Sequence, residues 1–590
     1  MTFPTDSSLT DNVTEPKKRR ISCLYLLLFL SILLIFPAFY LVCLYVPPLR
    51  ISEATTRITE PLTSDGQIDF VRYLEETMYP PEWSTDDNGY RIFVRTFGYT
   101  GGTSNSCKEQ LYKKLGLDIS IPPTMTLPQE PWTIITEYYK KRGETIPAEK
   151  RDSLTKPWTL EDWPMLADWV VAIDAPLDAV TEMIHKPIFF CPYLQEDESY
   201  RTGKSPELIH QHNDYLSGII VRNLARQYQA RANYRIAIGK TDEALDDIIT
   251  IYQLGRKYEQ SGCEITSQLV GLAIEGLANA APLATDSDHP LTKEQLQQLL
   301  DAVNQLPPRP PFEKIVETER IYGLSTIQYM FRSGEFINSR TFHPTVSAFL
   351  SSSSNPNVIY RRMNEAYDTF SGKRPRSEFT SYTKLPSTLY EALQTILTSH
   401  GRGKFLAALS IELLVSNLEL VERSIQLSDC SYNMKRLTLA LLIYKAEHGE
   451  LPTSDWIEKI QPYLGENFIQ YLRCPSCPVQ EEDKTNYALI LYDKLPKDVN
   501  TFLLVELREP VPFAQAVVSV DDVLEKFVSK TTVGHHKTQQ IGSFHFGGMN
   551  ISEQNGRVHF IGETPDGNEL RRQLGLEPKN EPNDSQNKDQ

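Results

Sequence analysis

The sequence predicts a mainly α-helical ectodomain, one N-terminal transmembrane helix and a C-terminal α+β module. Three observations predict this fold class. Residues 21–46 form an apolar run without charge, and residues 214–281 carry apolar side chains at helical spacing. After Pro452 the pattern changes to short alternating segments, which are typical of strands.

The run Ile21–Val46 directly follows the basic cluster Lys17–Arg20. At ~1.5 Å per residue, a helix of this length crosses the ~30 Å hydrocarbon core of a bilayer. Because basic residues stay on the cytoplasmic side, we expect residues 1–20 to form a cytoplasmic tail and the bulk of the chain to be extracytoplasmic. A cleaved signal peptide is the alternative, although its apolar region is normally shorter. The prediction is a single-pass protein of the cytoplasmic (inner) membrane that contacts lipid through this helix.

The composition is that of a globular chain. Of 590 residues, 40% are hydrophobic and 23% are charged, and the net charge is −16. An acidic exterior argues against nucleic acid as a partner. The eight cysteines are few for this length, and those beyond the apolar run permit disulfides in an exported segment without fixing their pairing.

The chain beyond the anchor divides into two predicted regions. Residues 50–400 are expected to form a mainly helical extracytoplasmic domain, with a loop-rich segment at 335–385 where Ser, Asn, Pro and Arg are frequent. A turn at Gly239 between two helices indicates a helical hairpin, either plain or of the tetratricopeptide type. Residues 404–564 should form a long helix and an antiparallel sheet, and residues 565–590 a disordered tail. Strands are predicted at Tyr487–Tyr492, Phe502–Leu507, Ala516–Val520, Asn550–Glu553 and Arg557–Ile561.

Three stretches between residues 55 and 285 are distinctive: Ile58–Leu62, Trp163–Trp169 and the helix pair around Gly239. Together they resemble a set of large uncharacterised envelope proteins of planctomycete type. The resemblance implies a membrane-anchored envelope protein, and its motifs carry no known chemistry.

The C-terminal region contains His545, then nine residues, then Asn555-Gly556, and it also contains Gly547, Gly548 and Asn550. This pattern resembles the His-x9-Asp-Gly motif of a pilin-like domain, with Asn555 in place of the usual Asp. The resemblance implies a long helix packed on an antiparallel sheet. On physical grounds, Asn-Gly between alternating segments also predicts a hairpin turn with positive φ at both central residues. The chain differs from pilins at Arg20–Cys23, where a pilin carries its processing site.

Two motifs suggest chemistry. His210, His212 and Asp214 have the spacing of a metallo-hydrolase motif, although Asp214 is equally suited to cap a following helix. Cys474 and Cys477 form a CxxC pair that could be redox-active, half of a zinc site or a local disulfide. Because no second CxxC follows, a local disulfide or an unreactive pair is favoured, and we expect neither a metal nor a cofactor.

The sequence contains no Gly-x-Ser-x-Gly, phosphate-loop or dinucleotide motif, so we expect no catalytic residues. The leading hypothesis is a binding or assembly role with an envelope protein as partner. One alternative is a membrane-anchored extracytoplasmic hydrolase that uses the His210, His212 and Asp214 cluster. A second alternative is an accessory component of a secretion system or pseudopilus.

Overall fold

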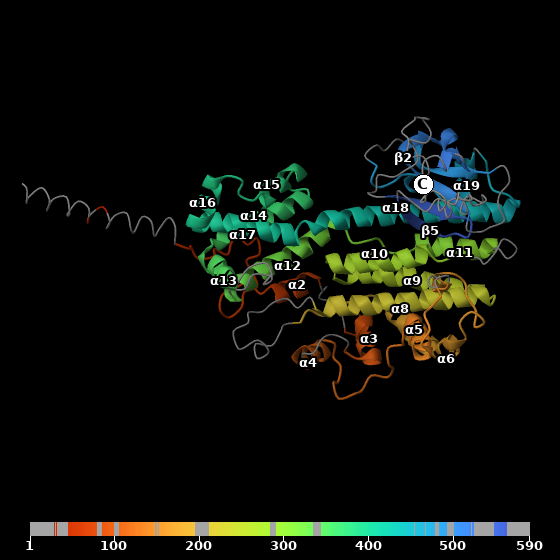
Figure 1. Cartoon of the computed structure of the whole chain (residues 1–590), viewed down its shortest axis with the longest axis horizontal. Coiled ribbons are helices and arrows are strands. Elements are labelled where there is room, and N and C mark those ends of the chain that lie inside the picture. The colour runs from red at the N-terminus through yellow and green to blue at the C-terminus, as the bar shows by residue number, and fades with distance from the viewer. Residues whose placement is uncertain are drawn as a thin grey trace, which may run out of the picture. The chain divides into compact units, whose positions relative to one another are not determined.

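The computed structural model describes residues 29, 31, 45–78, 85–99, 105–147, 150, 153–194, 212–262, 264–283, 291–333, 344–453, 455–466, 468–477, 483–492, 501–520, 522–523 and 548–562. The chain divides into two compact units. The first contains residues 1–68, 204–206 and 323–415, and the second contains residues 69–203, 207–322 and 416–590. Helix α12 (Phe312–Ser333) runs from the second unit into the first (Figure 1).

The first unit is helical. Its further elements are α13 (Pro344–Ser353), α14 (Pro356–Phe370), η7 (Arg376–Glu378), α15 (Phe379–Thr383), α16 (Leu389–Leu397) and α17 (Ser399–Leu414). The prediction of a loop-rich segment at 335–385 is therefore wrong for the described residues 344–385. The side chain of Asn355 accepts a hydrogen bond from Asn357 N, and Pro356 occupies the first helical turn. Asn355 and Pro356, whose residue types are common in loops, therefore begin helix α14.

The second unit begins with a series of short helices between Phe70 and Ile184. These are α2 (Phe70–Met78), η2 (Thr85–Asp87), α3 (Gly89–Phe97), α4 (Asn105–Lys114), α5 (Pro131–Arg142), η4 (Ser153–Thr155), η5 (Pro164–Leu166), α6 (Ala167–Ala172) and α7 (Asp174–Ile184). They pack against one continuous apolar core that includes Phe93, Trp163 and Leu177.

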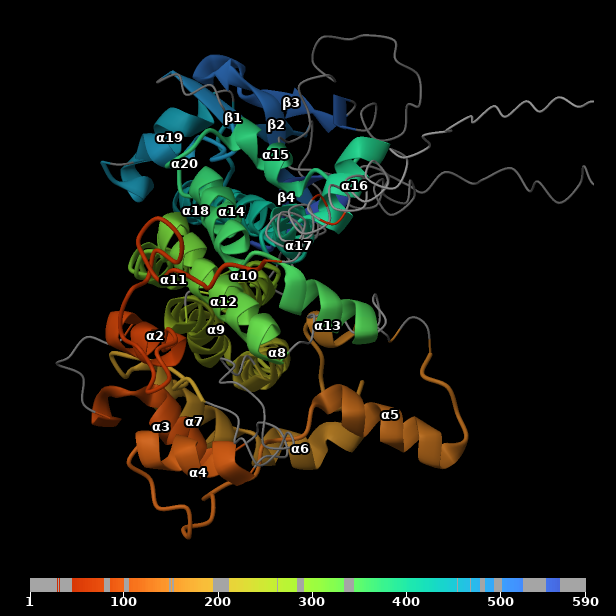
Figure 2. The same ribbon diagram turned by 90° about the vertical axis from the view of Figure 1, so that its left-hand side faces the viewer.

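Three long helices follow and lie side by side: α8 (His212–Ala237), α9 (Thr241–Gly262) and α10 (Ile265–Asn279) (Figures 1 and 2). Gly239 between α8 and α9 has a φ of 78°, a left-handed conformation that glycine adopts without steric cost. The predicted hairpin turn at this residue is present. Helix α11 (Lys293–Asn304) then begins at a capping box formed by Thr292 and Gln295.

The last part of the second unit is a helix-and-sheet module. Its elements are α18 (Asn417–His448), α19 (Trp456–Leu464), α20 (Phe468–Tyr471), β1 (Lys484–Leu491), β2 (Phe502–Pro512), η8 (Phe513–Gln515), β3 (Val517–Ser519), β4 (Gly548–Glu553) and β5 (Val558–Gly562). The strand order is β3-β1-β2-β4-β5. All neighbouring pairs are antiparallel except β1 and β3, which are parallel. A mainly helical chain with a C-terminal, largely antiparallel sheet is thus confirmed.

Helix α18 contributes to two hydrophobic cores. Cys430, Met434, Leu437 and Leu441 recur at helical spacing and pack with the sheet residues, among them Val505 and Ile551. A second stripe of α18, formed by Tyr432, Leu439 and Ile443, packs with the core of α8 to α11. Helix α18 therefore lies between the two cores and contributes side chains to both.

Among the described residues, no helix has the length and apolar character needed to cross a bilayer. The predicted span at 21–46 lies mostly outside those residues.

Candidate functional site

The predicted metallo-hydrolase motif lies at the start of α8. His210 lies outside the described residues, and the helix begins at His212. Asp214 is therefore inside the first helical turn and not at the cap that we expected. The metal-binding role of His210, His212 and Asp214 stays a prediction.

The predicted hairpin motif lies at the junction of β4 and β5. His545 and Gly547 are outside the described residues, Gly548 begins β4, and Asn550 lies within it. The turn is closed by a hydrogen bond of 3.0 Å from Gly556 N to Glu553 O. Of the two central residues that we expected at positive φ, only Gly556 has it, at 80°. The predicted two-residue turn is therefore wrong. The strands are joined instead by a longer loop, because Gln554, Asn555 and Gly556 all lie between Glu553 and Arg557. The loop ends at Gly556, which has the left-handed conformation.

The turn fixes the sheet onto two helical segments. The carbonyl of Asn555 accepts a hydrogen bond of 2.9 Å from Leu283 N, in the segment after α10. The carbonyl of Gly556 accepts one of 2.6 Å from the Nζ of Lys435, on α18. A Cβ at Gly556 would lie only 2.5 Å from Cδ1 of Leu283. The motif thus holds the module together through main-chain atoms.

Lys435 is a fully buried lysine. Burial, together with the nearby Arg557 guanidinium, lowers the pKa of Lys435 to about 7. Arg557 itself donates a hydrogen bond of 2.9 Å to the carbonyl of Ala280. A lysine with a lowered pKa can act as a general base, but its Nζ here is bonded to a buried carbonyl of its own chain.

A cluster of buried charges lies where α9, α10 and α18 meet. The guanidinium of Arg309 bonds Glu259 through Nη1 and Glu275 through Nη2. Its Nε lies 2.8 Å from Oδ1 of Asp429. Arg256 adds a second guanidinium, with its Nε 2.9 Å from Oε1 of Glu275. Both glutamates have a side-chain exposure of 0%, so the arginines replace the water that these carboxylates lose.

The close approach of two helices makes room for this cluster. A Cβ at Gly255 of α9 would lie 2.9 Å from the carbonyl oxygen of Gly271 on α10. A Cβ at Gly271 would lie 2.3 Å from Cγ of Glu259. The two glycines therefore let Glu259 and Glu275 fit between the helices.

The ring of Tyr432, on α18, lies against the cluster. The guanidinium carbons of Arg256 and Arg309 lie 5.5 and 5.4 Å from its centroid. Burial and the neighbouring Glu275 carboxylate raise the pKa of Glu259, whereas the two arginines oppose this effect. The arrangement is an internal ion-pair network of two arginines and their carboxylate partners.

Sequence reasoning missed Arg309, although a signal exists. The residues around it read Pro307-Pro308-Arg309-Pro310-Pro311. Prolines fix φ near −65°, so this segment holds its arginine at low conformational cost. The carbonyl of Pro307 also accepts a hydrogen bond of 2.6 Å from Arg256. An arginine between two proline pairs therefore indicates a restricted backbone at Arg309, and its ion pairs then position the guanidinium.

Cys474 and Cys477 lie in a buried turn after α20. The amide of Cys477 donates a hydrogen bond of 3.0 Å to the carbonyl of Cys474. Among the described residues, four cysteines are present as thiols without a disulfide bond: Cys191, Cys430, Cys474 and Cys477.

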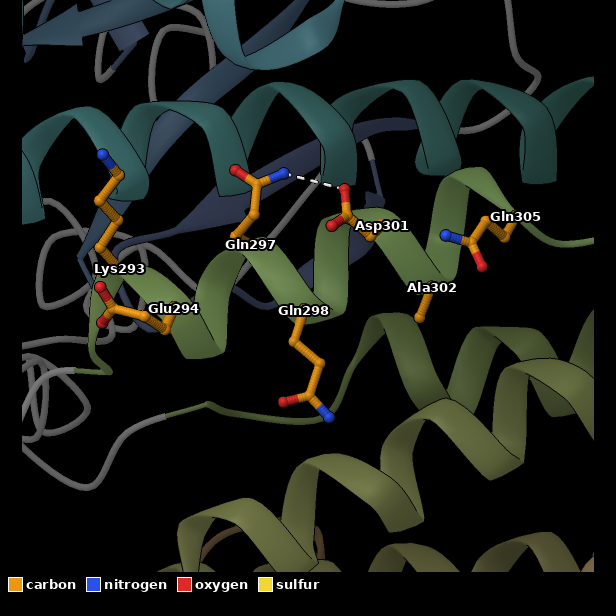
Figure 3. A pocket seen from close by; sticks show the side chains of 7 residues that line it. All are labelled: Lys293, Glu294, Gln297, Gln298, Asp301, Ala302 and Gln305. Carbon is orange, nitrogen blue, oxygen red and sulfur yellow. Dashed lines mark hydrogen bonds between the residues drawn. The ribbon is translucent and has the colours of Figure 1, made fainter.

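An open pocket lies on the outer face of α11 (Figure 3). The lining residues belong to this helix and its C-terminal cap: Lys293, Glu294, Gln297, Gln298, Asp301, Ala302 and Gln305. Gln297 donates a hydrogen bond of 2.9 Å to Asp301. Amides and charges of both signs on one rigid helix suit a polar contact surface better than a reaction site.

The chain matches no protein-family model, and neither curated proteins nor solved structures give a significant match.

Proposed function

We propose that the protein is a single-pass, membrane-anchored envelope protein with a binding or assembly role. The observation that carries this proposal is that several buried ionisable groups bond to one another or to the main chain. Arg309, Glu259, Glu275 and Lys435 all bond to other residues of the same chain. In these positions Arg309, Glu259 and Glu275 link α9 and α10, and Lys435 links α18 to the turn between β4 and β5. Groups that are used in this way are not presented to a substrate.

The membrane location rests on the uncharged run Ile21–Val46 behind Lys17–Arg20. This order of basic cluster and apolar run favours a cytoplasmic N-terminus and an extracytoplasmic bulk. The pilin-like interpretation of residues 404–564 draws support from a long helix packed on an antiparallel sheet. A binding role fits both features, because such a module presents a rigid outer surface from a fixed point on the membrane.

The polar face of α11 is the surface that we propose for an envelope protein partner. Helix α11 is held by its buried side chains Leu296, Leu299, Leu300 and Val303, and its capping box fixes its first turn. The opposite face presents the charged and amide groups of the pocket. A partner with complementary polar groups would bind without a conformational change in this helix.

Site-specific photo-crosslinking in intact cells tests this proposal. A photoreactive amino acid at Glu294, which is exposed on the pocket face, should give a discrete adduct with another envelope protein. The same amino acid at Val171 of α6, whose side chain is 82% exposed, serves as the control and should give no such adduct.

A chain that gives no adduct from either position, and runs as a monomer after gentle detergent extraction, would contradict the proposed role. If only the amino acid at Val171 gave an adduct, the chain would still bind a partner, but the partner would not bind at the α11 surface.

A further inference from the structure

Three buried metal-binding side chains converge between α18 and the sheet. Cys430 lies on α18, Cys474 in the turn after α20, and Glu506 on β2. Their ligand atoms, two sulfurs and one carboxylate oxygen, all lie within 4.8 Å of one another. All three residues have an exposed fraction of 0%.

This ligand set has a definite preference among metals. Thiolates select zinc and other soft or borderline transition metals, whereas magnesium and calcium take oxygen ligands only. Zinc bonds sulfur at ~2.3 Å, so two tetrahedral thiolate ligands have sulfurs roughly 3.8 Å apart. A separation below 4.8 Å for all three ligand atoms is compatible with a single ion of this kind.

Neighbouring groups already hold the Glu506 carboxylate and the main chain at Cys474. Oε2 of Glu506 accepts hydrogen bonds of 3.0 Å from Asn550 N and 3.4 Å from Asn550 Nδ2, which leaves Oε1 directed at Cys430 Sγ, 3.1 Å away. The amide of Cys474 donates a hydrogen bond of 3.0 Å to Oδ1 of Asn486. Outer contacts of this kind are what hold the ligands of metal sites in place.

A fourth ligand position also has candidates. The hydroxyl of Tyr487 lies 3.0 Å from Cys430 Sγ. Cys477 is buried in the same turn as Cys474, although its sulfur is not within the group of three and would have to rotate toward it.

We propose that Cys430, Cys474 and Glu506 bind one zinc ion, which links α18, the Cys474 turn and strand β2. Binding replaces the two thiol protons, which pass to solvent, by two zinc–sulfur bonds. The two thiolates neutralise the charge of the zinc ion, and the carboxylate adds one negative charge, which the hydrogen bonds from Asn550 stabilise. Because the site joins segments that are 76 residues apart along the chain at Cys430 and Glu506, it acts on the stability of the module. It also keeps both thiols from oxidation in an exported protein.

The test is metal analysis of the full chain, purified in detergent without chelators from zinc-supplemented cells. We expect about one zinc per chain, and cobalt exchange should give a sulfur-to-cobalt charge-transfer absorption. The variant Glu506→Gln keeps the side-chain shape and one acceptor for Asn550, and it should bind zinc at least tenfold more weakly while keeping its helical circular dichroism. Cys430→Ser should abolish the charge-transfer band.

Two controls make the result specific. Cys191→Ser removes a described thiol outside the group, and His212→Ala removes the predicted hydrolase ligand, so both should retain the full zinc content. Zinc that is lost in His212→Ala but kept in Cys430→Ser would overturn the proposal. A zinc-free chain in which peptide mapping finds a Cys430–Cys474 disulfide would overturn it as well, and so would reduced thiols that bind no added zinc.

Discussion

The buried Lys435, which bonds the carbonyl of Gly556, should make the stability of the chain depend on pH. Its pKa of about 7 in the folded chain is lower than the ordinary lysine value of about 10.4, because burial disfavours the charged ammonium group. Between these two pH values the unfolded chain binds more protons than the folded chain. The free energy of unfolding therefore rises with pH across this window, by up to about 1.4 kcal/mol per pH unit for this group. Below pH 7 both states carry the proton and the contribution is constant.

The variant Lys435→Met should remove this pH dependence. We expect the native chain to gain stability relative to the variant as the pH rises from 7 to 10, in denaturant titrations of the detergent-solubilised full chain. The exposed Lys404, changed to Met, should leave the slope unaltered. Equal slopes for the native chain and Lys435→Met would show that this amino group does not titrate as a buried lysine.

The contact between α9 and α10 depends on two glycines. Gly255 and Gly271 allow the helices to approach closely enough to enclose Glu259 and Glu275. Larger residues would separate the helices and pull the buried glutamates away from their arginine partners, and an unpaired buried charge costs about 3–5 kcal/mol.

Two alanine substitutions on α10 separate this effect from helix propensity. Gly271→Ala should lower the free energy of unfolding by about 3 kcal/mol, because its Cβ would meet Glu259 and the carbonyl of Gly255. Gly276 lies on the same helix, and a Cβ there would meet nothing within 4 Å. Gly276→Ala should therefore stabilise the chain by up to about 1 kcal/mol. Chemical denaturation measures both values, and similar effects at the two positions would refute the close-packing explanation.

The elements show how far local sequence signals reach. The hairpin at Gly239 and all five strands were predictable, because their signals lie within a few residues of one another. The error at 335–385 came from composition, since Ser and Asn favour both loops and helix caps. Asn355 caps α14, whose Ile359, Met363 and Tyr367 are fully buried, and that helical spacing outweighs the composition.

The candidate sites could not be predicted in the same way. Arg309 meets Asp429, which is 120 residues further along the chain, and Cys430 meets Glu506 across 76 residues. No spacing rule connects such residues, because only tertiary packing brings them together. The CxxC pair drew attention to Cys474, but its neighbours in space are a helix residue and a strand residue of unrelated sequence pattern.

Helix α18 connects the helical layer and the sheet of the second unit. One face of this helix packs on the sheet and another packs on α8 to α11. We predicted a long helix and an antiparallel sheet at residues 404–564, and the unit that contains the sheet also contains residues 69–203 and 207–322. Each fully buried apolar side chain contributes roughly 1.5–3 kcal/mol, so the two buried faces of α18 stabilise its packing on both layers.

We propose that this unit lies outside the cytosol, on a membrane anchor at residues 21–46. The decisive experiment adds protease to intact spheroplasts and then detects a C-terminal tag. We predict that the tagged fragment is digested before lysis, while a cytosolic marker protein survives. A tag that stays intact until the spheroplasts are lysed would contradict the proposed topology.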